Sequence, residues 1–389
     1  MKKCIAVLAA FASAGTFAQS RVSLSGLLDT AVTHVRTEAG GRTVSKTGMF
    51  GSGFQSNFLR FDGREDLGDG WYSTFRLEAG LNTDSGLGIA SNSNNQRSGA
   101  GPAASAMTFN RWAYVGLGSN RFGEVRVGRV YTAAFENFTP YDPFFTNGVG
   151  SSTPVTLRLG LRNTQTALNV SNAIEYLTPG YGQGFFGRVT LALGENPSDG
   201  TLAAGNPRHA GDHGAVRIGY ASGPWSVAFS AGLTQNTAGA IGAVNNQGDY
   251  LNTNLSARYD FGWVRVQGQY VTESLEGATA AGGGLTGNPA HEAKTRSLLL
   301  GAIFPVGPGN FKVSYIHGRL TDNIGNPAEK GQLIAVGYDY NLSKRTAIYT
   351  VFSHIDNNAV GNYGFPAQYV TTGRGESSQG FSVGMRHIF

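Results

Sequence analysis

The chain has 389 residues, of which 57 are glycine and only 14% are charged, and its mean hydropathy is slightly below zero. The formal net charge of +5 is mild and no basic run exceeds two residues, which argues against nucleic acid as a partner. After residue 18 no stretch approaches the roughly 20 apolar residues of a membrane-spanning helix. Hydrophobic residues that are plentiful but never concentrated are typical of alternating β-strands.

Residues 1–18 have the pattern of a cleaved signal peptide. A short basic n-region is followed by an apolar h-region, Cys4–Ala14, and by a small-residue cleavage site that ends at Ala18. Cys4 is the only cysteine and lies in this segment. The mature chain, residues 19–389, is therefore expected to be exported and to have neither a disulfide nor a cysteine metal site.

Apolar and polar residues alternate with period 2 along much of the mature chain. In residues 71–80, for example, Phe75 and Leu77 alternate with Arg76 and Glu78. Such segments predict strands of roughly 9–11 residues, the length that crosses a bilayer at a tilt. Other alternating segments lie around 54–64, 185–193, 216–220, 225–234, 251–260, 264–270, 334–340 and 381–389.

The connections between these segments alternate between short and long. Seven short turns and eight long loops predict sixteen strands, with both termini on the side of the short turns. The long loops, rich in Gly, Asn, Ser and Ala, are expected near 37–53, 83–106, 131–166, 194–212, 236–248, 273–293, 320–330 and 356–376. An even strand number with loops of unequal length on the two sides is typical of bacterial outer-membrane barrels.

The sequence therefore predicts an all-β fold: a 16-stranded antiparallel transmembrane β-barrel with long extracellular loops and short periplasmic turns. A closed barrel satisfies every backbone polar group within lipid. Sixteen strands also leave an aqueous channel rather than a packed interior. The alternative, a soluble β-solenoid or sandwich, would not explain why long and short loops alternate so strictly.

Motifs spread from the first strand to the last resemble those of the Gram-negative general porin family of β-proteobacteria, the Neisseria/Bordetella/Burkholderia type. They are Val22–Asp29, Gly63–Gly70, Phe109–Leu117, Phe122–Arg129, Asn172–Pro179, Tyr340–Thr346 and Val383–Phe389. The resemblance implies a homotrimer in the outer membrane of a Gram-negative cell, in contact with outer-membrane lipid and lipopolysaccharide. It implies that the loop at 131–166 folds into the barrel as the pore-constricting loop. It also implies that the outer-membrane assembly machinery recognises the terminal Phe389.

Arginines are expected to set the ion preference of such a pore, because charged side chains on a channel wall select ions. Arg111 and Arg129 match pore arginines of the family, whereas Phe58 and Asn169 stand where the family commonly has arginine. Together, strand parity, the narrowing loop and the resemblance predict a lining of Arg60, Arg76, Arg111, Arg129, Glu136, Asp142, Arg158, Arg162, Arg188, Arg217, Arg258, Arg265, Arg386 and Phe58.

Within the narrowing loop, Glu136 and Asp142 are expected to face Arg158 and Arg162. The excess of arginine over carboxylate on the lumen side predicts a mild preference for anions. The alternative is that arginines pair with neighbouring carboxylates and cancel, as the Arg60/Asp62 and Arg76/Glu78 spacings would allow.

Passive diffusion of ions and small hydrophilic solutes is the function that these features favour. One alternative is a substrate-specific porin for organic anions, with Phe58, Tyr141, Phe144 and Phe145 as aromatic contacts. Another is an outer-membrane adhesin or enzyme that uses the barrel as a scaffold. The G-x-G-x-x-G match at 182–187 precedes a strand instead of the helix that a dinucleotide needs. No catalytic residue, metal or cofactor is expected.

Overall fold

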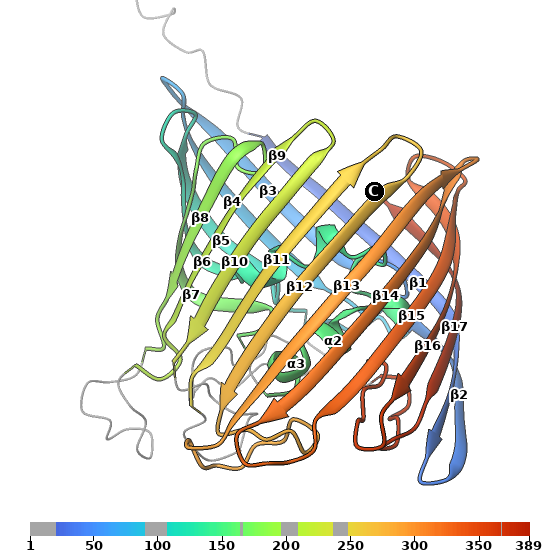
Figure 1. The fold of residues 1–389 in the computed structure, drawn as a ribbon. Coiled ribbons are helices and arrows are strands. Elements are labelled where there is room, and N and C mark those ends of the chain that lie inside the picture. Colours follow the sequence, from blue (N-terminus) through green and yellow to red (C-terminus); the bar gives the residue numbers. More distant parts are fainter. Residues whose placement is uncertain (1–20, 90–106, 164–165, 196–208, 236–247, 367) are drawn as a thin grey trace, which may run out of the picture.

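The computed structural model describes residues 21–89, 107–163, 166–195, 209–235, 248–366 and 368–389, and their strands close into one antiparallel barrel (Figure 1). Residues 1–20, which include the predicted signal peptide, lie outside the described residues, as do most of the loops predicted at 83–106, 194–212 and 236–248. No helix among the described residues is long and apolar enough to span a membrane.

Seventeen strand segments follow one another around the barrel. They are β1 (Arg21–Ala39), β2 (Arg42–Gly51), β3 (Phe58–Gly68), β4 (Trp71–Gly80), β5 (Trp112–Ser119), β6 (Gly123–Tyr131), β7 (Asn169–Leu177), β8 (Gly184–Ala192), β9 (His213–Ser222), β10 (Trp225–Thr234), β11 (Tyr250–Asp260), β12 (Arg265–Glu276), β13 (Glu292–Val306), β14 (Gly309–Asp322), β15 (Glu329–Asn341), β16 (Thr346–Asn357) and β17 (Ser378–Ile388).

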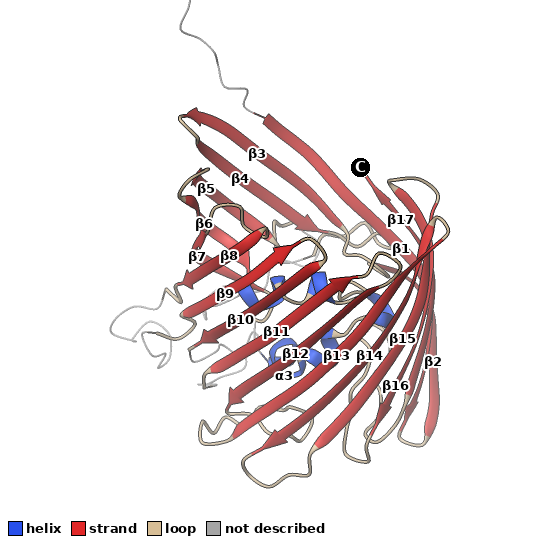
Figure 2. Ribbon diagram, turned by 45° about the horizontal axis from the view of Figure 1, so that its top comes forward, coloured by secondary structure: helices blue, strands red, loops and turns tan. Residues whose placement is uncertain are grey.

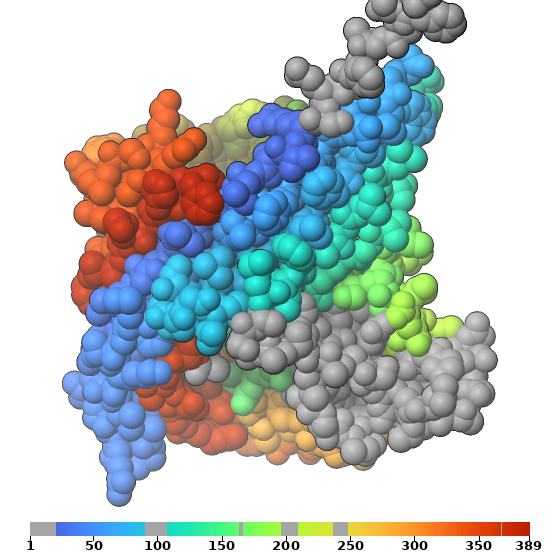
Figure 3. Space-filling model, turned by 180° about the vertical axis from the view of Figure 1, so that it is seen from behind, coloured from blue at the N-terminus to red at the C-terminus, as the bar shows by residue number. Residues whose placement is uncertain are grey.

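Two of these segments together make one strand of the barrel. The second half of β1 pairs with β2, and its first half pairs with β3, so β2 and β3 lie end to end along the same neighbour. β17 pairs with β1 and closes the sheet. The barrel therefore has sixteen strands, and the predicted fold class is confirmed. Figure 3 shows the blue N-terminal strands lying against the red C-terminal strand on the outer surface.

The loop predicted at 37–53 was wrong, because these residues form the end of β1, a tight turn, the whole of β2 and the first two residues after it. The turn consists of Gly40 and Gly41, with φ of 64° and 72°. Two consecutive left-handed residues are what a two-residue hairpin turn with the correct twist requires, and glycine adopts them without a Cβ penalty. The strands are thus longer here than alternation alone indicated.

The break between β2 and β3, residues 52–57, turns into the barrel around one buried carboxylate. Asp29 accepts hydrogen bonds from the backbone N–H groups of Gly53 (3.1 Å), Phe54 (3.1 Å) and Gln55 (2.7 Å), and from the hydroxyl of Tyr349. These bonds satisfy backbone N–H groups that do not pair with a neighbouring strand at the break. The break places Phe54 in the interior and brings Gln55 to the lumen.

The glycine-rich composition is partly explained by aromatic rings that lie over glycines on neighbouring strands. A Cβ placed on Gly26 would be 2.3 Å from the ring of Phe389, and one on Gly63 would be 1.9 Å from the ring of Phe75. The glycines therefore leave room for cross-strand rings, a pairing that compensates for the missing side chain.

The loop between β6 and β7 lies inside the barrel, where it forms short helices (Figure 2). We call residues 132–168 the inner loop. Its helical segments are α1 (Ala133–Glu136), η1 (Thr139–Tyr141), η2 (Gly148–Gly150), α2 (Thr153–Thr156) and α3 (Arg158–Asn163). α1 contacts β8 to β11, and η2 contacts β15 to β17. Between these two regions, α3 contacts β12 and β13, and α2 contacts β13 to β15. The inner loop thus follows the wall formed by β8 to β17.

Apolar side chains hold the inner loop against that wall. Phe144, Val149 and Val155 are each at most 1% exposed and pack with residues of β13 to β16. Tyr363 and Phe365, from the last loop (residues 358–377), join the same cluster. Full burial of one such side chain contributes about 1.5–3 kcal/mol. One side of the barrel interior is therefore filled, and a cavity remains beside β3 to β5.

Candidate functional site

A cavity of about 490 Å³ lies between the inner loop and the wall formed by β3, β4 and β5. It is lined by Leu27, Gln55, Ser56, Phe58, Arg60, Glu78, Arg111, Trp112, Tyr131, Phe135, Glu136, Thr139, Pro140, Phe145, Thr146, Asn147 and Arg217. Among the predicted lining residues, the structure brings Phe58, Arg60, Arg111, Glu136 and Arg217 together here. Three arginines and two carboxylates supply the charge around this space.

The wall side of the cavity carries a ladder of shared ion pairs. Arg60 lies 3.2 Å from Asp62 and 3.6 Å from Glu78, and Arg111 lies 3.5 Å from Glu78. Arg76 lies 2.6 Å from Asp62. The sequence-based alternative, that arginines pair with neighbouring carboxylates, thus holds in part, with Arg76 contacting Asp62 in place of Glu78. Three arginines share two carboxylates, so this wall keeps an excess of positive charge.

On the opposite side, Glu136 of α1 is held by an arginine behind it. Arg188 of β8 forms ion pairs with both Glu136 and Glu175, and it donates a hydrogen bond to the carbonyl of Tyr131. Arg188 is 1% exposed. It therefore ties the start of the inner loop to the barrel and does not border the cavity. Its charge offsets that of Glu136, which makes the carboxylate less effective toward a passing ion.

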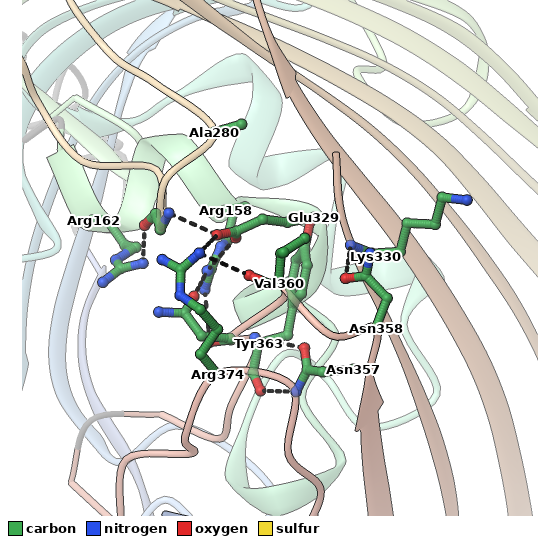
Figure 4. Close-up of polar contacts among 12 residues, drawn as sticks. Arg158, Arg162, Ala280, Glu329, Lys330, Asn357, Asn358, Val360, Tyr363 and Arg374 are labelled. Carbon is green, nitrogen blue, oxygen red and sulfur yellow. Dashed lines mark hydrogen bonds and ion pairs between the residues drawn. The ribbon is translucent and has the colours of Figure 1, made fainter. Parts of the chain in front are cut away.

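The far end of the inner loop is fixed by a second polar cluster (Figure 4). Arg158 of α3 lies 3.1 Å from the buried carboxylate of Glu329 of β15. Glu329 also lies 3.6 Å from Arg374 of the last loop and accepts a 2.7 Å hydrogen bond from the backbone N–H of Gly282. Arg162 donates to the carbonyl of Gly282. One carboxylate thereby joins the inner loop to two other loops.

The expected approach of Glu136 and Asp142 to Arg158 and Arg162 does not occur, because each of these residues has other partners. Asp142 is 1% exposed and accepts hydrogen bonds from the backbone N–H (3.1 Å) and hydroxyl (2.6 Å) of Ser152. Burial raises the pKa of the Asp142 carboxyl above its ordinary value. Asp142, Arg158 and Arg162 therefore hold the inner loop in shape away from the cavity, whereas Glu136 borders it.

Arg129 also lies elsewhere than expected. Arg129 was expected in the lining from the family resemblance, but in the alternation of β6 it shares the face of the outward-facing Val125 and Val127. Arg129 borders a depression with the exposed side chains of Val127 and Ile174, and donates a 2.6 Å hydrogen bond to the carbonyl of Asn110. The alternation of β6 thus agrees with the observed position of Arg129, whereas the resemblance pointed to the lumen.

The remaining predicted arginines are spread along the lumen. Arg217 donates to the Tyr181 hydroxyl (2.6 Å) and to Asn137 (3.1 Å) at the edge of the cavity. The guanidinium of Arg258 lies 5.8 Å from the ring centre of Tyr141. Arg265 lies 3.0 Å from Asp260 near a short turn. Arg386 donates a 2.5 Å hydrogen bond to Gln55.

Several lining residues were missed by the sequence analysis. Trp112, Tyr131 and Phe135 border the cavity, whereas Tyr141 and Phe144, named as aromatic contacts, are at most 2% exposed and face the packed interior. The alternation of β5 was a signal for Trp112. No signal in the sequence could place Phe135, because its position depends on how the inner loop folds.

A closed sixteen-stranded barrel with a charged opening beside an inner loop defines a membrane channel of the bacterial outer-membrane class. The chain belongs to the Gram-negative porin family, whose model matches residues 5–360. Family, fold, channel function and outer-membrane location, as predicted from the sequence, are thereby confirmed. Among the described residues, no group of three or more His, Cys, Asp or Glu could hold a metal ion.

Individual relatives agree with this assignment. The chain is 33% identical to outer membrane porin protein 32 of Delftia acidovorans over 100% of both chains. It is 28% identical to an outer membrane porin protein of Bordetella pertussis over 92% of this chain and 95% of that one. An anion-selective porin from Comamonas acidovorans matches with a TM-score of 0.75 and 30% identity, over 95% of this chain and 100% of that one. OmpT of Vibrio cholerae in its trimer form, at 15% identity and a TM-score of 0.64 over 95% and 99% of the two chains, shares the fold.

Proposed function

We propose that this porin prefers small anions mildly over cations, and that its narrowest part is the cavity between the inner loop and β3 to β5. The observation that carries the proposal is the charge around that cavity. Three arginines border it against two carboxylates, and one of these, Glu136, already has its ion pair with Arg188. Two unit charges about 4 Å apart interact by roughly 4 kcal/mol at an effective dielectric constant near 20.

Arg60 is the arginine best placed to act on a passing anion. Its side chain keeps 27% exposure, compared with 11% for Arg111. Without Arg60, the remaining wall charges form two balanced pairs, Arg76 with Asp62 and Arg111 with Glu78. The selective excess of the wall thus depends on this residue. The anion-selective relative from Comamonas acidovorans, which is 30% identical, supports the same sign of selectivity.

The test is the reversal potential of the protein in a planar bilayer under a KCl gradient. The parent protein should show chloride preference, and Arg60→Gln should move the reversal potential towards zero. Arg345→Gln, at an exposed short turn away from the cavity, is the matched control and should leave it unchanged. A clear cation preference of the parent protein would overturn the proposal.

We propose further that three copies of the chain form the functional unit in the outer membrane. The support is membership of the porin family and the trimer form in which a fold relative, OmpT, was solved. Outward-facing side chains such as Val383 and Met385, which are 50% and 55% exposed, provide apolar surface for lipid, the lipid part of lipopolysaccharide and neighbouring copies. Light scattering of the detergent complex gives the number of copies, and a monomer mass would contradict the trimer.

A further inference from the structure

We propose that the cavity beside the inner loop binds aromatic carboxylates in preference to aliphatic carboxylates of equal charge. This inference rests on the proposed anion preference, because the arginines must attract the carboxylate group. It goes further in assigning a second recognition element, a surface of aromatic rings. The site would make the porin selective for one class of organic anion within a general diffusion channel.

Aromatic rings form a continuous surface from the barrel wall to the inner loop. The ring of Trp112 in β5 meets that of Tyr131 edge to face, with centroids 5.2 Å apart. Tyr131 in turn lies 5.1 Å from Phe135 of α1, at an interplanar angle of 35°. All three border the cavity. Aromatic groups prefer offset or edge-to-face contacts with other rings, so such a surface favours a planar ring over a saturated one.

Two further rings, those of Phe58 and Phe145, border the same cavity, and each has a cation over its face. The guanidinium of Arg60 lies 4.7 Å from the ring centre of Phe58. The ammonium of Lys312 lies 4.5 Å from the ring centre of Phe145, which also meets Phe54 at 5.7 Å. Phe145 has a φ of 52°, a conformation that L-residues rarely adopt. Its tertiary contacts, not its local backbone preference, hold this ring at the cavity.

Polar groups suited to a carboxylate lie beside these rings. Arg60 contacts Asp62 through Nε and Glu78 through Nη1, which leaves the N–H groups of its Nη2 for a further acceptor. Arginine binds carboxylates in a two-pronged geometry that a monatomic ion cannot use. The hydroxyl-bearing Thr139 and Thr146 border the same space. An anionic head on Arg60 with its ring on the aromatic surface would satisfy both parts of the lining.

The experiment compares block of the chloride current by benzoate and by cyclohexanecarboxylate in planar bilayers. The two acids have the same charge and similar size, but only benzoate has an aromatic ring. Benzoate should block saturably, at about three- to tenfold lower concentration, as expected from the strength of one aromatic contact. Phe58→Leu combined with Phe135→Leu should abolish the difference between the acids, with each block expressed relative to that variant's own KCl conductance. Phe381→Leu, on the outward face of β17, is the control and should preserve the difference.

Each outcome separates this inference from the proposed function. Equal block by both acids, or no block by either, in a channel that prefers chloride would overturn the aromatic site and leave anion preference intact. Cation preference of the parent channel would overturn both. If the double variant does not assemble, Phe58→Leu alone measures the same ratio of blocking concentrations, and an unchanged ratio would count against the site.

Discussion

Glu329→Gln is expected to loosen the end of the inner loop while the apolar packing of the inner loop against the barrel wall stays intact. Glu329 is fully buried and holds Arg158 of α3 at 3.1 Å and Arg374 of the last loop at 3.6 Å. The amide oxygen of glutamine can still accept the hydrogen bond from Gly282. Both ion pairs are lost, and Arg158, which is 6% exposed, keeps its positive charge in a buried place.

The magnitude follows from these burials. Removing one partner of a buried ion pair costs about 3–5 kcal/mol, because the other charge stays uncompensated. The Arg374 pair adds little, since this side chain is 48% exposed and exposed pairs contribute about 1 kcal/mol or less. A loss of about 3 kcal/mol raises the population of a loosened inner loop by about a hundredfold.

Single-channel recording measures this population as the time spent in reduced-conductance states. Glu292→Gln is the matched control, because Glu292 pairs with the exposed Lys294 at 2.9 Å and its loss should be nearly silent. Adding Arg158→Met to Glu329→Gln removes the stranded charge and should restore quiet currents in part. If Glu329→Gln and Glu292→Gln behave alike, the cluster does not hold the inner loop and the reasoning is refuted.

Three other predictions concern the ends and the interior of the barrel. Phe389→Asp should lower the yield of folded, heat-modifiable protein severalfold with signal cleavage unaffected, because the Phe389 ring packs over Gly26; normal yield in the membrane fraction would refute this. Burial raises the pKa of Asp142 above 3.8. Just above that pH, the folded state therefore keeps a proton on Asp142 that the unfolded state has released, and the stability of the folded state falls as the pH rises through this range. Asp142→Asn should therefore gain in unfolding temperature relative to the parent as the pH rises above 3.8, and an opposite trend would contradict the assignment. Lys312→Met should cost about 3–5 kcal/mol by stranding the Asp339 carboxylate 3.1 Å away, and adding Asp339→Asn should recover most of the loss in a thermal melt.

The fold could be predicted from the sequence because the signals that determine it are local. Alternation decides which side chains face lipid and which face the lumen, and a closed sheet is the strand arrangement that satisfies the backbone in a bilayer. Arg60 and Glu78 could be placed on one wall by parity alone. The C-terminal strand, with Phe381 and Val383 outward and Ser382 inward, is likewise found as predicted.

Tertiary structure decided what local patterns could not. Two glycines at positive φ made a hairpin of the loop predicted at 37–53, and the fold of the inner loop buried Asp142 away from the cavity that it was expected to line. The path of the inner loop depends on contacts with strands more than a hundred residues away, as between Arg158 and Glu329. Such pairings are absent from any local window of sequence. The sequence by itself therefore determined the barrel, its family and the polarity of its walls, and only the folded chain decided which charges and rings meet at the cavity.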